Sequence, residues 1–135
     1  MLASGLPDIV ADDENLARFL TSSSQFNAQM AKPSAFLPAA SERETSVFRH
    51  GSEPRDALWA IGDEHAAGHR NIHGAAVVKA RDVRAVLLDV IADEPPLRHA
   101  AIKGWPWLED DPEEQKAQQK ELANQVASRA MVVRR

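Results

Sequence analysis

Histidine and arginine side chains recur at the ends of expected strands in this sequence. Arg49 ends one such strand, His73 lies within a second, and Arg98 and His99 begin a third. Two imidazoles and a guanidinium suffice for metal-independent cleavage of a phosphodiester. One imidazole accepts the proton of a 2′-hydroxyl, the other protonates the leaving oxygen, and the guanidinium stabilises the pentavalent phosphate. One hypothesis is therefore a ribonuclease-like phosphodiesterase acting on RNA or nucleotides, with Arg49, His73 and His99 as catalytic residues.

The same residues also have a purely structural interpretation. A histidine near the start of a strand commonly bonds a backbone carbonyl, and Arg49 or Arg98 can pair with the carboxylates of residues 89, 93 and 94. Structural ion pairs are commoner than active sites. The catalytic hypothesis requires all three side chains to converge on one cleft, whereas the structural interpretation does not.

Three histidines, His73 among them, are spaced four residues apart, at His65, His69 and His73. Two histidines at this spacing on one helix can chelate a metal ion. Gly68 should end the helix between them, and no glutamate follows His65 as the general base of a zinc peptidase would. We therefore expect a helix end and a surface loop here, with neither a metal site nor a cofactor.

A tryptophan pair around a proline, Trp105-Pro106-Trp107, precedes an acidic segment over residues 109–114. Tryptophan is favoured at protein interfaces because it buries a large area at a small entropic cost. The alternative is a lid that closes one end of the sheet, since large aromatic side chains are usually buried. We take Trp105 and Trp107, together with Arg98, as the candidate partner-binding residues, and assign the acidic segment to a helix N-terminus.

Composition excludes several other classes of protein. The chain has 135 residues, a net charge of −4 and no cysteine, so disulfides, thiolate metal sites and a general nucleic-acid coat are excluded. Phosphate-binding glycine loops and hydrolase nucleophile motifs are absent from the sequence. Residues 1–13 lack the pattern of a signal peptide, and no apolar run reaches the roughly 18 residues of a membrane span. We expect a cytoplasmic protein with no membrane partner.

Periodicity and turn residues predict the elements that would position these side chains. Leu16, Phe19 and Leu20 have helical spacing, which predicts a helix from residue 12 or 13. Strands are expected over 35–37, 45–49, 72–78, 88–91 and 98–102, and helices over 52–68, 80–87 and 112–133. The last helix has Asp111 as its cap, Pro112 in its first turn and a thin, alanine-rich apolar stripe.

This order of elements predicts an α+β fold. We expect a small mixed or antiparallel sheet of about four to five strands, with helices packed on one face and an amphipathic C-terminal helix. A single domain should cover residues 1–135, with residues 1–11 as a flexible N-terminal segment.

Two functional hypotheses follow. The first is a small accessory protein that works by contacts with another protein or with itself, through the tryptophan pair and the stripe of the last helix. Such a protein would fit as a component of a bacterial multi-protein system of the defence or toxin type. Arginine outnumbers lysine eleven to five and alanine occurs 23 times, a bias typical of GC-rich bacterial genes that bears on source and not on function. The second hypothesis is the phosphodiesterase described above.

Overall fold

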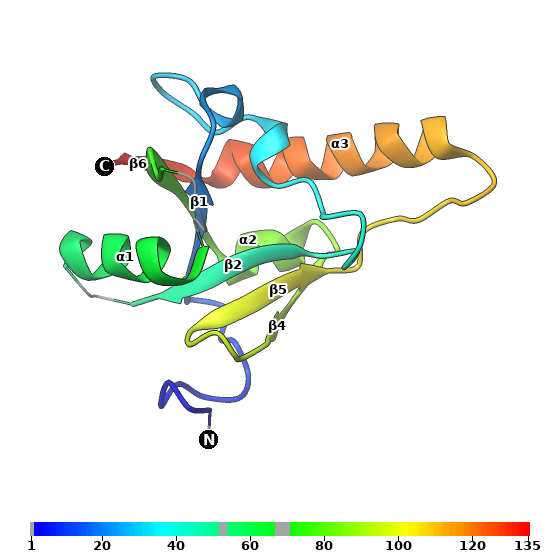
Figure 1. The fold of residues 1–135 in the computed structure, drawn as a ribbon. Coiled ribbons are helices and arrows are strands. Elements are labelled where there is room, and N and C mark those ends of the chain that lie inside the picture. The colour runs from blue at the N-terminus through cyan, green and yellow to red at the C-terminus, as the bar shows by residue number, and fades with distance from the viewer. Residues whose placement is uncertain (1, 52–53, 67–70) are drawn as a thin grey trace.

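The fold is given by a computed structural model that describes residues 2–51, 54–66 and 71–135. Within these residues six strands form one antiparallel sheet in the order β4-β5-β2-β1-β3-β6 (Figure 1). The strands are β1 (Asn15–Leu20), β2 (Thr45–His50), β3 (Gly74–Lys79), β4 (Asp89–Ala92), β5 (His99–Lys103) and β6 (Met131–Arg134). The helices are α1 (Arg55–Ile61), α2 (Ala80–Ala85) and α3 (Pro112–Arg129), with 3₁₀ turns η1 (Ser23–Gln25) and η2 (Pro33–Ala35) and a π turn, η3 (Gly62–Ala66).

The central strand β1 replaces the first expected helix. Leu16 and Leu20 belong to one buried cluster, whereas Ala17 and Phe19 belong to a second cluster on the other side of the sheet. A strand that is buried on both faces carries apolar residues at adjacent positions, and such a run can imitate the spacing of an amphipathic helix. The helix prediction for residues 12–20 is therefore wrong.

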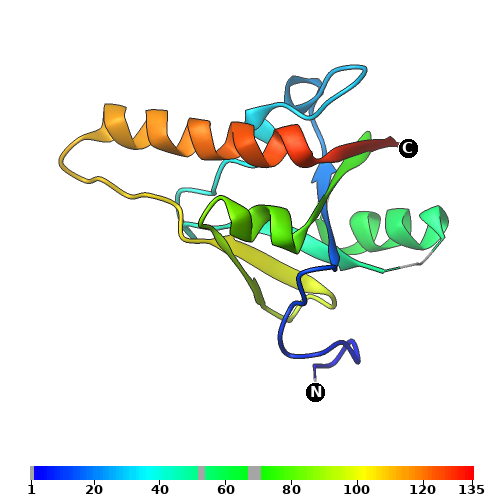
Figure 2. The same cartoon turned by 180° about the vertical axis from the view of Figure 1, so that it is seen from behind.

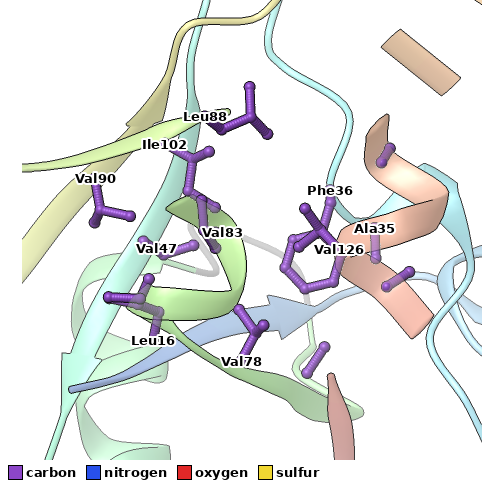
Figure 3. Packing of buried hydrophobic residues seen from close by; sticks show 14 of the residues in the cluster. Leu16, Ala35, Phe36, Val47, Val78, Val83, Leu88, Val90, Ile102 and Val126 are labelled. Atoms are coloured by element: carbon purple, nitrogen blue, oxygen red, sulfur yellow. The ribbon is translucent and has the colours of Figure 1, made fainter. Parts of the chain in front are cut away.

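Helices cover both faces of the sheet, not one face as expected. The larger cluster combines strand residues such as Val47 and Val78 with Val83 of α2 and Val126 of α3 (Figure 3). The smaller cluster, on the other face, contains Leu58 and Trp59 of α1 together with Phe48 of β2. Because the sheet is covered on both sides, β1 and β3 carry apolar residues at adjacent positions.

The last helix begins as predicted and ends early. The Asp111 carboxylate accepts a hydrogen bond from the Glu114 amide at 3.1 Å, and Pro112 occupies the first turn. The helix ends at Arg129, and residues 131–134 form β6 beside β3 instead of continuing the helix. Val132 and Val133 are β-branched and favour a strand once a neighbouring strand is available.

The α+β class is confirmed, but the described residues form six strands, not four to five. Four expected strands are present as β2, β3, β4 and β5, whereas residues 35–37 form no strand in the structure. The two additional strands, β1 and β6, both lie where the sequence predicted helix. Among the described residues, no helix is long and apolar enough to cross a membrane.

Candidate functional site

The three predicted catalytic residues do not meet. Arg49 lies opposite Leu16, on the face of the larger cluster, whereas His99 lies opposite Phe48, on the other face. His73 precedes β3, and its amide donates to the Leu20 carbonyl at 2.8 Å. Leu20 is four residues along β1 from Leu16, which is roughly 13 Å at strand spacing. The structure therefore does not bring two imidazoles and a guanidinium into one cleft.

Arg49 is a buried structural residue, only 1% exposed. Its Nε and Nη2 donate to the two carboxylate oxygens of Glu14 at 2.7 and 2.9 Å, and Nη1 donates to the Pro7 carbonyl at 2.7 Å. Burial raises the pKa of Glu14, but hydrogen bonds from Arg49 and the Ala11 amide, with the charges of Arg49 and Arg84, bring that pKa below its ordinary value. Arg49 thus ties the N-terminal segment to the sheet.

His99 is likewise engaged within the fold. It is 8% exposed, and its Nδ1 lies 2.8 Å from the Asp93 carbonyl while Nε2 lies 3.0 Å from the Ser46 hydroxyl. Its ring meets Phe48 edge-on, with centroids 5.5 Å apart. Both ring nitrogens have partners, which corresponds to the structural interpretation of a histidine at a strand start.

Arg98 lies far from the tryptophan pair with which it was grouped, since it precedes β5 and the pair follows that strand. Arg98 Nε donates to the Arg49 carbonyl at 3.2 Å, beside a cleft of about 640 Å³ that Pro7, Glu14 and His50 also line. Burial and the charge of Arg49 lower the pKa of Arg98, and burial and the charge of Arg98 lower the pKa of His50. This cleft is the seam between the N-terminal segment and the sheet.

The two tryptophans differ in environment. Trp105 is 4% exposed, belongs to the larger cluster and donates from Nε1 to the Ile102 carbonyl at 3.1 Å. It therefore acts as the lid and not as an exposed anchor. Trp107 is half-buried, and the Arg43 guanidinium lies 4.9 Å above its ring while also pairing with Glu109 at 3.3 Å.

The two halves of α3 also differ. The buried residues of this helix, Ala123, Val126 and Ala127, all lie in its carboxyl-terminal half. The amino-terminal half extends past the end of the sheet in both views (Figures 1 and 2). Its links to the body are polar, since Gln115 accepts from the Leu108 amide at 2.6 Å and Gln119 donates to the Pro106 carbonyl at 2.8 Å.

The projecting half of α3 carries a shallow groove of about 430 Å³. Its lining residues are Glu114, Ala117, Gln118, Glu121 and Leu122. With 3.6 residues per turn, these positions are centred on the side of the helix opposite its buried residues Ala123, Val126 and Ala127. Glu114, Gln118 and Glu121 run along the middle of this shallow surface, and Ala117 and Leu122 flank it. We call it the α3 groove.

Sequence reasoning did not single out the α3 groove, although one signal pointed to it. The predicted apolar stripe of the last helix begins only at Leu122, so the first half of the helix had no face to bury. No motif identifies a groove of this kind, because its shape depends on what the helix leaves uncovered.

No metal site is evident among the described residues, in which no group of three or more His, Asp or Glu side chains could hold an ion. His69 lies outside the described residues, and His65 stacks on Phe48 with ring centroids 6.4 Å apart. Comparison of the chain with protein-family models, with curated proteins and with solved structures found no match.

Proposed function

We propose that this protein is a small binding protein that acts through protein–protein contacts, with the α3 groove as its docking surface. The observation that carries the proposal is the uncovered half of α3. A helix is normally stabilised by packing one face on the body of the protein. Here an 18-residue helix packs only its second half and presents the α3 groove on its first half.

The chemistry of the groove favours a basic amphipathic helix as its occupant. The small side chain of Ala117, on one flank of the groove, permits close approach of a second helix, because helix separation depends on side-chain size at the contact. Glu114 and Glu121 lie two turns apart on the same side and can pair with lysine or arginine on the occupant. Lys116 and Lys120 lie on another side of the helix and do not line the groove.

The proposal does not use the tryptophan pair, Trp105 and Trp107, as the anchor for a partner. Trp105 belongs to the core. Trp107 lies between Pro106 and Leu108, which bond to Gln119 and Gln115, and it does not line the α3 groove. The phosphodiesterase hypothesis receives no support from the positions of Arg49, His73 and His99.

Titration with a synthetic peptide tests this function. The probe is an amphipathic helix of about five turns, with leucine and alanine on one face and lysine along its flanks. Backbone amide shifts should change at Ala117, Gln118 and Leu122. The double reversal Glu114→Lys/Glu121→Lys should weaken binding about fivefold or more, because two exposed charge pairs contribute about 1 kcal/mol together.

The matched control is Asp110→Lys/Glu113→Lys, which makes the same change in net charge outside the groove. It should leave the affinity within about twofold of the wild type. Equal loss in both double variants would mean diffuse charge attraction and would contradict the proposal. A wild-type protein that shows no amide shifts on α3 would contradict it as well.

A further inference from the structure

Strand β6 forms one edge of the sheet, and its register shows which backbone groups face outward. The Arg135 amide donates to the His73 carbonyl at 3.1 Å, and Val133 lies opposite Ala75. In an antiparallel pair, hydrogen-bonded and non-hydrogen-bonded positions alternate. Residues 131, 133 and 135 therefore direct their N–H and C=O groups toward β3. Val132 and Arg134 direct theirs away from the sheet.

These outward groups are not taken up by the fold. Within residues 2–51, 54–66 and 71–135, no recorded hydrogen bond reaches the main-chain N–H or C=O of Val132 or Arg134. Figure 2 shows β6 continuing directly from α3 at the carboxyl-terminal end of the chain. An edge of this kind presents a template for one more strand.

At the opposite edge of the sheet, side chains of the protein bind outward main-chain groups of β4. By the same alternation, Val90 and Ala92 of β4 face outward, because Asp93 is a hydrogen-bonded position whose amide donates to the His99 carbonyl. The Val90 amide donates to the Asp89 carboxylate at 2.7 Å, and its carbonyl accepts from Arg84 Nη2 at 3.3 Å. Side chains thus occupy both main-chain groups of Val90, and β6 has no such arrangement among the described residues.

Arginine side chains surround the β6 edge on both faces. Arg134 lies over the ring of Phe26, at 5.3 Å from its centroid. Arg135 lies on the other face and makes two 2.6 Å hydrogen bonds with the Asp63 carboxylate. Arg129 precedes the strand, is exposed and donates to a main-chain carbonyl. The charge beside this edge is therefore net positive.

This positive charge favours one of two occupants of the edge, which are β6 of a second copy of the chain and an acidic strand of another protein. Pairing β6 with β6 of a second copy would bring like-charged Arg134 side chains together on one face, which is unfavourable. An acidic strand would place its carboxylates beside Arg134 and Arg129. On the other face, Met131 is 71% exposed and Val133 is half-buried, so apolar side chains of the added strand would pack there.

We infer that the β6 edge is a second interaction surface, which accepts an extended acidic segment of a partner protein as an added strand. Main-chain hydrogen bonds to Val132 and Arg134 supply the affinity, and the side chains on the two faces select the sequence. The favoured segment alternates carboxylate and apolar residues. This surface is separate from the α3 groove and does not depend on it.

Amide hydrogen exchange on labelled protein tests the inference, with an acetylated and amidated peptide of alternating glutamate and valine as the probe. In the free protein, the amides of Val132 and Arg134 should exchange faster than those of Met131 and Val133. Saturating peptide should slow exchange at Val132 and Arg134 by about tenfold or more. A peptide with lysine in place of glutamate should have no effect.

The variant Val132→Pro separates the edge from the strand itself. Proline removes an N–H that faces outward and leaves the hydrogen bonds to β3 in place. It should abolish peptide binding, whereas the control Val132→Thr should bind within about twofold of the wild type. Unchanged protection at the Val133 amide would show that β6 is intact in both variants.

Three results would overturn the inference. One is equal binding of the acidic peptide by the proline and threonine variants, and another is equal binding of the lysine peptide by the wild type. The third is protection of Val132 and Arg134 that rises with protein concentration in the absence of peptide. That third result would assign the edge to a second copy of the chain.

Discussion

The two edge strands of this sheet, β4 and β6, differ in whether side chains of the protein bind their outward main-chain N–H and C=O groups. At β4, the outward backbone groups of Val90 are occupied by the side chains of Asp89 and Arg84. Arg84 also donates to the Val10 carbonyl at 2.8 Å and to the Asp12 carboxylate at 2.6 Å, so the N-terminal segment is held at the same edge. At β6, arginines stand beside the edge but leave its backbone uncovered.

The comparison shows that charge at an edge has two effects. A charged side chain that folds back onto the backbone closes the edge, as Arg84 does at β4. A charged side chain that lies over a neighbouring ring, as Arg134 does over Phe26, leaves the edge open and selects the charge of what can pair with it. The charge beside β6 is therefore expected to select an acidic strand, whereas at β4 the main-chain groups of Val90 are already occupied by side chains of the protein.

The largest expected effect comes from removing the buried cation that holds the N-terminal segment. Arg49→Met leaves Glu14 without its partner and frees the Pro7 carbonyl. Breaking a largely buried ion pair from one side costs about 3 kcal/mol, and urea unfolding measures this loss. The double variant Arg49→Met/Glu14→Gln should recover part of it, because no unpaired charge remains. A double variant as unstable as Arg49→Met would contradict the pairing.

A smaller loss is expected from opening the β4 edge directly. Arg84→Ala removes the bonds to Val90, Val10, Asp12 and Asp89, which together should reduce the free energy of unfolding by about 1–2 kcal/mol. The Val90 amide should then exchange faster, while exchange at Val132 should not change. Arg81→Ala, an exposed arginine on the same short helix, is the matched control and should stay within about 0.5 kcal/mol of the wild type. Equal effects of the two variants would contradict the closed-edge description.

The smallest expected effect is a loss of folding stability at acidic pH. Glu14 has a folded-state pKa below its ordinary value, so its contribution to stability is complete above the unfolded pKa of about 4.3 and is lost as pH falls through the folded pKa. The urea midpoint should fall below about pH 4.5 through Glu14, in addition to a shallower decline between pH 7 and 4.5 that follows from the lowered pKa of His50. Glu14→Gln should flatten the steeper decline, and Glu113→Gln should retain it. A decline unaffected by Glu14→Gln would assign the acid response to other groups.

Some elements were predictable because their signals are local. The cap of α3 at Asp111 and the strands β2, β3, β4 and β5 were all placed within about two residues, a normal margin for element ends. The structural alternative for His99, a bond to a backbone carbonyl, was also available from its position near a strand start. In each case neighbouring residues carry the information.

The positions of the candidate site residues were not predictable in the same way. Arg49 and His99 begin or end neighbouring strands, yet the pairing of His99 with Phe48 places their side chains on opposite faces. A shift of one residue in strand register moves a side chain to the other face. No property of either residue type reveals that register.

By itself, the sequence determined the α+β class, the start of the last helix and the absence of any cysteine chemistry. These follow from composition and from interactions between residues a few positions apart, as helix hydrogen bonds are. Only the tertiary structure decided that β1 and β6 are strands, that half of α3 is uncovered and that one sheet edge is open. The reason is that strand hydrogen bonds need distant partners, so the same residues form a helix or a strand according to what lies beside them.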